Sequence, residues 1–245
     1  DDRIFRLETY NFDLPPHLIA QYPAEPRDSS RLLVMDKNDG GIEDRIFYQV
    51  IDYLDPGDTL VLNNTRVIPA RLHGYKDTGA KVEVLLLKKD GRFWQSLVRP
   101  AKRLKPGTVV YFQDAKERLE IVGELDLPGG RLVQFLDCAN EADFIEKIGE
   151  MPLPPYIARH AQEADRLRYQ TVYAKNLGSA AAPTAGLHFT QSLLERIAGK
   201  GVNLATVLLH VGLGTFRPVS SPDIRSHQMH YEYYRMDEET AALLN

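Results

Sequence analysis

The spacing of apolar and polar positions divides the chain into a central segment of short strands and two flanking segments of mixed helix and strand. From about Arg71 to Asp137, alternating or apolar runs are separated by Gly-, Pro- and Asp-containing turns. This spacing is typical of a small β-barrel or sandwich. We therefore expect six strands here, with the sequences RLHGYK, AKVEVLLLK, RFWQSLVRP, TVVYFQ, RLEIVGEL and RLVQFLDC.

The flanking segments show the patterns of an α/β fold. The sequence predicts helices over residues 12–22, 47–54, 141–150 and 192–200, the last with Thr190 as its N-cap. It predicts strands over residues 31–37 and 59–69, and a buried strand in VNLATVLLHVG. Between these parts, the prolines of MPLPPYIAR impose a stiff, extended connection.

We predict an α/β protein whose larger core domain is an open barrel-like sheet with helices, interrupted by a small antiparallel β-barrel domain. The predicted core comprises residues 1–67 and 151–245, and the inserted barrel comprises residues 68–150. The last ten residues, MDEETAALLN, have the pattern of an amphipathic helix with no stop signal after it. We therefore expect the core to be incomplete at its C-terminal end.

Composition narrows the class of protein. The 245 residues are 43% hydrophobic and include 30 Lys or Arg and 34 Asp or Glu, for a net charge of -4. These values are ordinary for a folded globular protein, and no run approaches the roughly 18 apolar residues of a membrane span. Cys138 is the one cysteine, which excludes an internal disulfide framework. Because the N-terminus has no apolar signal core, we expect a cytoplasmic protein. We also expect a monomer.

The stretch GSAAAPTAGLHFT (178–190) is the first candidate site. It carries no acidic or basic group other than the imidazole of His188, and its small residues let backbone N–H groups approach a ligand closely. The alternative is a tight loop packed by alanines, because neither GxxxxGK[ST] nor GxGxxG is present. The candidate substrate-binding residues here are Pro183, Thr184, Ala185 and Gly186.

Two further candidates lie where apolar strands end, which is where open α/β sheets bind ligands. His210 ends one strand, and Gly212, Gly214 and Thr215 follow it. Asn63, Asn64, Thr65 and Arg66 follow another strand. Each group is also explained as a turn, because Asn and Gly favour turns for backbone reasons. Together with His188, they suggest one shared pocket.

The segment SHQMHYEYY contains a possible metal-ligand set in His227, His230 and Glu232. The spacing differs from the HExxH helix of zinc peptidases, and no cysteine contributes. We favour acid–base roles for His230 and Glu232 and expect no metal.

Two basic clusters beside aromatic residues suit a nucleic acid, through phosphate contacts and base stacking. The alternative is a solvated surface, since Glu163 and Asp165 lie among these charges. The candidate RNA-binding residues are Arg99, Lys102, Arg103, Lys105, Tyr156, Arg168 and Tyr169.

Several long motifs, in order, carry a resemblance to a known family. MPLPPYI, RYQTVYA, AAPTAGLHFT, LHVGLGTFRPV, NNTRVIPARL and HxMHxE resemble the S-adenosylmethionine:tRNA ribosyltransferase-isomerases of queuosine synthesis. The resemblance covers nearly the whole chain. The GTTSVR-like and NFHLP-like motifs that follow in this family are absent.

The resemblance implies a larger α/β domain with an inserted β-barrel, in agreement with the strand pattern. It also implies an enzyme that moves the ribosyl part of S-adenosylmethionine, with isomerisation, onto the aminomethyl group of 7-aminomethyl-7-deazaguanine in a tRNA anticodon. The expected products are epoxyqueuosine-tRNA, adenine and methionine. S-adenosylmethionine is then a consumed substrate, and no cofactor is expected.

For this chemistry we assign proton transfers to His188 and His210, with His230 or Glu232 in reserve, because imidazole titrates near neutrality. Two alternatives remain open. One is a tRNA-binding module without catalysis. The other is an S-adenosylmethionine-dependent RNA methyltransferase, although the first strand lacks the glycine fingerprint of that fold.

Overall fold

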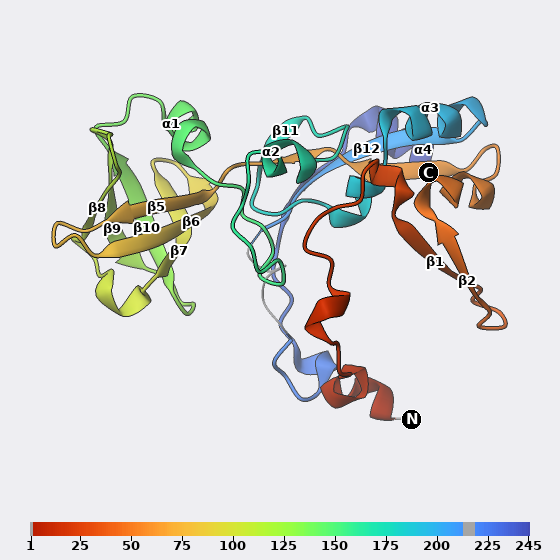
Figure 1. The fold of residues 1–245 in the computed structure, drawn as a ribbon, viewed down its shortest axis with the longest axis horizontal. Helices are drawn as coiled ribbons and strands as arrows, with labels where there is room; N and C mark the ends of the chain where they lie inside the picture. Colours follow the sequence, from red (N-terminus) through yellow and green to blue (C-terminus); the bar gives the residue numbers. More distant parts are fainter. Residues whose placement is uncertain (1, 213–218) are drawn as a thin grey trace.

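A six-stranded closed barrel forms one end of the molecule and an α/β core forms the other (Figure 1). The computed structural model describes residues 2–212 and 219–245. The barrel order is β10-β7-β6-β5-β8-β9, with every neighbouring pair antiparallel. The strands are β5 (Arg71–Tyr75), β6 (Lys81–Asp90), β7 (Phe93–Arg99), β8 (Val109–Tyr111), β9 (Arg118–Glu124) and β10 (Gly130–Leu136). All six predicted strands are confirmed.

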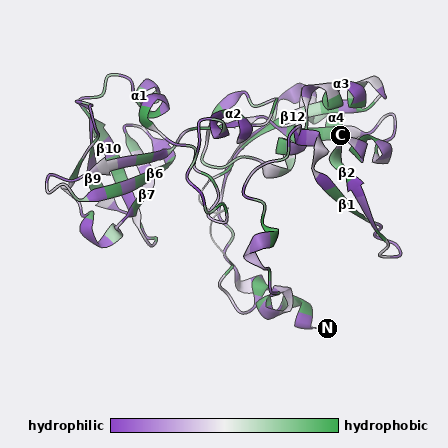
Figure 2. Ribbon diagram, in the orientation of Figure 1, coloured by the Kyte–Doolittle hydropathy of each residue, from purple (hydrophilic) through white to green (hydrophobic). Residues whose placement is uncertain are grey.

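Alternation along the strands explains the barrel. In β9, Leu119 and Ile121 are fully buried while Arg118, Glu120 and Val122 are partly exposed. Apolar and polar colours also alternate along the barrel ribbons (Figure 2). Helix α1 (Glu141–Ile148) covers one side of the barrel, where Phe144 packs edge-on against Phe112 and Phe135. The interior is therefore a packed apolar core of its own.

The barrel joins the core at one place. Where the chain enters and leaves the barrel, Arg71 and Glu150 form an antiparallel bridge, with N···O distances of 3.2 Å and 2.9 Å. Beside it, the backbone of Pro69 lies so close to Gly149 that an added Cβ would come within 1.9 Å of the Pro69 carbonyl oxygen. The glycine thus permits close passage of the two connecting segments.

Besides a two-stranded hairpin at residues 31–46, the described core contains two small sheets. In one, β12 (Asn203–His210) lies between β3 (Thr59–Asn63), to which it is parallel, and the antiparallel β13 (Tyr233–Arg235). In the other, β11 (Asn176–Ser179) is parallel to β4 (Thr65–Val67). Hydrogen bonds at their ends connect the sheets, as from the N–H of Ala180 to the carbonyl of Val211. The α/β class with an inserted barrel is confirmed.

Helix α3 (Gln191–Gly199) packs against the 3-10 helix Phe47–Tyr53 to make the second apolar core. Thr190 caps α3, as predicted: its hydroxyl accepts a hydrogen bond from the N–H of Leu193. Helix α4 (Glu238–Leu244) begins at Asp237, whose carboxylate accepts from the N–H of Thr240. A four-residue helix, α2 (Asp165–Arg168), follows the Pro-rich connection.

The predicted helix over residues 12–22 is wrong, because this segment has a single 3-10 turn, Pro16–Leu18. Prolines 15 and 16 contribute no N–H, and Phe12 and Leu18 are 73% and 64% exposed. A short amphipathic segment that buries no apolar face lacks what stabilises most protein helices. Residues 2–10 continue away from the core and contact the segment near Pro222, and the two protrude together (Figure 1).

The strand at residues 203–210 is less buried than its sequence predicts, because several of its residues are partly or fully exposed. The hairpin of β1 (Arg31–Met35) and β2 (Ile42–Ile46) extends from the core. Leu33, Met35 and Ile42 on it are each at least 60% exposed. No helix in the described part of the chain combines the length and apolar character needed to cross a bilayer.

Candidate functional site

A cavity of about 580 Å³ lies in the core beside the Pro-rich connection. This volume falls within the range of pockets that bind small molecules. Its wall is formed by the segment after Ala20, the Pro-rich connection, helix α2 and the loop that ends at His188. Apolar and aromatic residues make up about half of the lining, among them Tyr22, Tyr156 and Tyr169, and the others are polar or charged and include four arginines.

His188 contributes an imidazole to this cavity. Its Nδ1 lies 3.0 Å from the hydroxyl oxygen of Ser30, and its ring packs at 5.1 Å, centroid to centroid, from Phe47. Burial lowers the pKa of His188 below its ordinary 6.5, against a smaller opposing effect of the Arg27 backbone. The neutral imidazole therefore predominates at pH 7, as a proton acceptor requires.

The small residues before His188 serve close packing. Ala180, Ala181 and Ala182 are buried, and residues 184–188 form a 3-10 turn. A Cβ on Gly186 would lie 2.1 Å from the Tyr173 hydroxyl. The small residues therefore pack the loop tightly, and the loop also presents Thr184 and His188 to the cavity.

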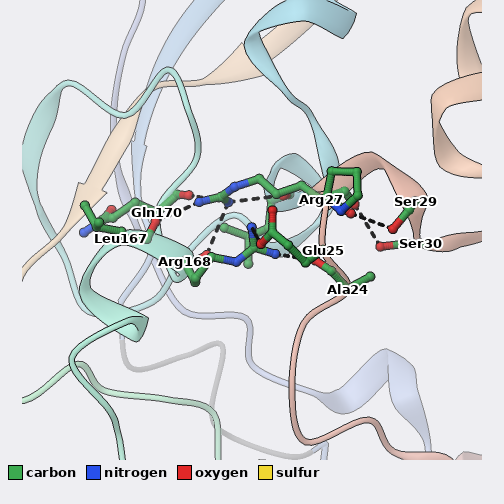
Figure 3. A network of polar contacts seen from close by, with 10 residues as sticks. Ala24, Glu25, Arg27, Ser29, Ser30, Leu167, Arg168 and Gln170 are labelled. Atoms are coloured by element: carbon green, nitrogen blue, oxygen red, sulfur yellow. Dashed lines mark hydrogen bonds and ion pairs between the residues drawn. The ribbon is translucent and has the colours of Figure 1, made fainter.

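Arg27 joins its own segment to residues 167–170, as Figure 3 shows, and also to Leu187 at the cavity. Its guanidinium donates to the carbonyls of Leu167 at 2.8 Å and Gln170 at 2.7 Å, and, at longer range, to those of Arg168 and Leu187. Burial is the main cause that lowers its pKa. A guanidinium has five N–H donors, so one side chain can hold several carbonyls in place.

A buried ion pair forms another part of the wall. Arg159 makes two hydrogen bonds, of 2.7 Å and 2.8 Å, to the carboxylate of Asp165. The side chains are 15% and 7% exposed. The hydrogen bond from Arg159 is the largest cause that lowers the pKa of Asp165. The guanidinium also lies over the ring of Tyr22, at 4.6 Å from its centroid.

His210 has a different set of neighbours. Its Nδ1 lies 2.8 Å from the Thr65 hydroxyl, and its ring stacks on Tyr233. Gly178, at φ +145, lies so close that an added Cβ would come within 2.7 Å of the imidazole. Burial lowers the pKa of His210 as well. Neither His210 nor the Asn63–Arg66 turn lines the cavity at His188, so that cavity does not collect all the predicted site residues.

The Asn63–Arg66 turn has structural roles in the described chain. The Asn63 amide donates to the Leu209 carbonyl and accepts from its N–H, at 2.9 Å and 3.1 Å. The Asn64 side chain accepts from Asn176 at 2.9 Å. Arg66 is exposed. The Asn63 bonds join β3 to the end of β12, and the Asn64 bond joins the turn to β11. Any contact of the turn with a substrate stays a prediction.

Glu232 lies near the end of β12, as a member of a hydrogen-bonded pair. One carboxylate oxygen accepts from the N–H of Gly212 at 2.8 Å and lies 3.1 Å from Nε2 of His230. Within residues 2–212 and 219–245, no three side chains of the metal-ligating types are grouped to hold an ion. The predicted residues Gly214 and Thr215 lie outside the described residues.

A second cavity, of about 870 Å³, lies between the barrel and the Pro-rich connection. Arg99, predicted to bind RNA, lines it together with Arg71, whose partner is Glu83 at 3.3 Å. Lys102 and Arg103 lie on the adjacent 3-10 turn Ala101–Arg103, followed by Lys105. Arg99 is thus the one of these four basic residues that lines this cavity, and contact of any of the four with RNA stays a prediction.

The other predicted RNA-binding residues line the cavity that contains His188. Tyr156 is 53% exposed, whereas Tyr169 is 6% exposed, and burial raises the pKa of Tyr169 to about 12. Arg168 pairs with Glu25 at 2.8 Å and donates to the carbonyl of Ala24. Tyr156 is therefore the more accessible of the two rings.

Sequence reasoning did not identify Arg27 and Ser30 as site residues. Both lie in PRDSSR, which follows the wrongly predicted helix and has no periodic pattern. Their partners are more than 130 residues away. The polar residues that follow Pro26 could have marked this segment as a candidate site, but they do not show which distant residues they contact.

Comparisons with known proteins point to one family. Residues 7–245 match the model of a family described as queuosine biosynthesis protein. The chain is 57% identical, over 246 aligned positions, to the S-adenosylmethionine:tRNA ribosyltransferase-isomerase of Syntrophomonas wolfei subsp. wolfei, with all of this chain and 70% of that protein covered.

One solved structure is also similar. It is the S-adenosylmethionine tRNA ribosyltransferase of Thermotoga maritima, 34% identical, with a TM-score of 0.39. The comparison covers 96% of this chain and 64% of that one, so the chain spans less than two thirds of the solved relative's length. The family expected from the sequence motifs is confirmed.

Proposed function

Because the chain belongs to the queuosine biosynthesis protein family, we propose that it acts in the transfer and isomerisation of the ribosyl group of S-adenosylmethionine to tRNA. The acceptor is the aminomethyl group of 7-aminomethyl-7-deazaguanine in the anticodon. The products are epoxyqueuosine-tRNA, adenine and methionine. The observation that carries this proposal is the 57% identity to a relative of that name along the whole chain.

The cavity at His188 suits the substrate in size and chemistry. Tyr22, Tyr156 and Tyr169 line it, and aromatic rings attract cations such as a sulfonium and stack on adenine. Its size is also that of a typical small-molecule pocket. We place S-adenosylmethionine in this cavity, as a consumed substrate.

The reaction needs a proton acceptor and a proton donor. The sulfonium acidifies the neighbouring ribose C5′, so a base can remove a proton there. The amine loses a proton as it forms its new C–N bond, and adenine gains one as the glycosidic bond breaks. The C5′–S bond breaks with its electron pair on sulfur, which leaves as neutral methionine. We assign the base to His188 and a second proton transfer to His210, since both hold neutral imidazoles near pH 7 that can accept a proton. An imidazolium formed in this way can then supply the proton that adenine gains.

The tRNA would contact the barrel and the Pro-rich connection. We assign phosphate contacts to Arg99, Lys102, Arg103 and Lys105 beside the barrel, and base contact to Tyr156. A cytoplasmic location follows from the need to meet tRNA.

One assay tests the proposal. The protein is incubated with S-adenosylmethionine and tRNA that carries 7-aminomethyl-7-deazaguanine, and the small-molecule products are separated. Free adenine and methionine are expected. S-adenosylhomocysteine in their place would indicate methylation instead, and neither product, with tRNA still bound, would indicate a binding module.

A further inference from the structure

We propose that Ser30 and the backbone of Arg27 are positioning groups that hold His188 in the tautomer with its proton on Nδ1, which leaves Nε2 as the basic nitrogen of the cavity. The inference rests on the proposed function for its catalytic meaning. The tautomer itself is a property of the folded protein, and it is measured without any substrate.

The hydrogen-bond directions around Ser30 lead to this assignment. The Ser30 hydroxyl lies 3.0 Å from the carbonyl oxygen of Arg27, and a carbonyl oxygen can only accept. The single hydroxyl proton of Ser30 is therefore used in that bond. Its oxygen lies 3.0 Å from Nδ1 of His188 and is left to accept there. Nδ1 must then carry the proton.

The Arg27 carbonyl is the acceptor that fixes the direction of the Ser30 hydroxyl. In the opposite tautomer, the lone pair of Nδ1 would face the Ser30 oxygen, and the one hydroxyl proton would have to leave the Arg27 carbonyl to bond Nδ1. The Ser30 contact uses Nδ1, so Nε2 is the ring nitrogen left for a ligand in the cavity.

The position of the ring is held from several sides. The Arg27 guanidinium donates to the carbonyl of Leu187, the residue directly before His188, at 3.2 Å. Arg27 therefore contacts this pair of residues through both its side chain and its backbone. Phe47 packs against the imidazole face. These contacts limit rotation of the ring and keep Nδ1 toward Ser30.

The Arg27 contacts also connect the imidazole to helix α2. The same guanidinium holds the carbonyls of Leu167 and Gln170 (Figure 3). Tyr169 lies between those two residues in the chain and lines the cavity. One side chain thus places the proposed base and a ring of the proposed substrate pocket relative to each other. A base aligned in advance in this way increases the rate of proton transfer.

The test is a long-range ¹H–¹⁵N NMR correlation of the histidine side chains, recorded on the full chain at a pH where His188 is neutral. Correlations between ring nitrogens and ring protons identify which nitrogen carries hydrogen. His188→Asn assigns the signal by its loss, and its amide stays near the Nδ1 position. The expected result is Nδ1–H in the native protein, a mixture of tautomers in Ser30→Ala, and recovery of Nδ1–H in Ser30→Thr, which keeps the hydroxyl.

Ser29→Ala is the matched control. Ser29 is the residue directly before Ser30, and its hydroxyl donates to the carbonyl of Pro26 instead of contacting His188. The tautomer of His188 should be unchanged in it. Detection of Nε2–H in the native protein, or an unaltered spectrum in Ser30→Ala, would overturn the proposal.

Kinetics separate positioning from the proposed function. In the adenine-release assay, Ser30→Ala should lower kcat roughly fivefold, the effect of one hydrogen bond, while KM for S-adenosylmethionine changes little. Ser30→Thr should recover kcat. If no form of the protein releases adenine but the tautomer responds as expected, the tautomer assignment holds and the proposed function fails.

Discussion

The Thr65 hydroxyl lies 2.8 Å from Nδ1 of His210 and joins β4 to the end of β12. Thr65 is 1% exposed, so its hydroxyl has no access to solvent and the imidazole is its partner in the core. Gly178, on the neighbouring β11, leaves the space that the ring occupies. The orientation of His210 therefore depends on a buried hydroxyl and on the absence of one methyl group.

Gly178→Ala should displace the imidazole of His210. The new Cβ would lie 2.7 Å from the ring, and φ +145 is unfavourable for alanine. We expect a stability loss of about 1–3 kcal/mol, measured by urea unfolding, and a larger loss of adenine release. Gly40→Ala is the control, because Gly40 also has positive φ but an added Cβ there meets no atom. Equal effects of both changes on activity would argue against a role for His210.

His188→Ala and His210→Ala should each lower turnover at saturating substrates by about 10²-fold or more, as expected for the loss of a general acid or base. The measurement is the rate of adenine release. His17→Ala, at an exposed histidine, is the control and should retain the native rate. Near-native turnover in both site variants would show that other groups carry the proton transfers.

The pH dependence of kcat/KM should have an acid limb below pH 6.5. Burial lowers the pKa of both His188 and His210 from 6.5, so the basic, neutral forms persist to lower pH than for a free imidazole. Activity should therefore be constant near pH 7 and fall as the pH drops through the lowered values. A limb centred above 6.5 would contradict neutral histidines as the essential bases.

Asp165→Asn should destabilise the core by about 3–5 kcal/mol, because it leaves the guanidinium of Arg159 without its buried partner. The free energy of unfolding is measured in urea at pH 7. Asp44→Asn removes the partner of Arg31 in a pair that is 81% and 69% exposed, so it should change stability by less than about 1 kcal/mol.

The same pair gives a pH signature. The pKa of Asp165 is lower in the folded state than its ordinary 3.8, so its contribution to stability is present above 3.8 and is lost as the pH falls through the lowered value. The stability difference between the native chain and Asp165→Asn should therefore shrink in acid. If the stability difference between the two proteins stays the same as the pH falls below 3.8 and through the lowered pKa of Asp165, the ion pair is not the cause of that difference.

The barrel could be predicted because each of its strands carries its own signal. Alternation places Leu119 and Ile121 on one face, and the turns between strands are local in sequence. The cap of α3 at Thr190 is equally local. The α/β patterns on both sides of these strands indicated that the barrel is an insertion, and the family resemblance implied the same arrangement.

The candidate site could be predicted in part. His188 was identified from the composition of residues 178–190, because it is the one imidazole in a stretch of small residues. Ser30 was not, because its contact with His188 joins residues 158 positions apart, and no local pattern records such a pairing. The segment 12–22 was predicted wrongly for a related reason: its apolar spacing suggests a helix, but no surface of the described chain packs against it well enough to fold one.

The bridge between Arg71 and Glu150 brings the two ends of the barrel segment together. A unit whose first and last residues lie side by side can be inserted into a surface loop without distorting the domain that carries it. For the α/β core, the barrel is equivalent to a short loop between two adjacent points. Its own core also shares few side chains with that of the host. The barrel could therefore be exchanged for another of similar footprint, so the surface that it offers to a partner can vary while the cavity at His188 keeps its shape.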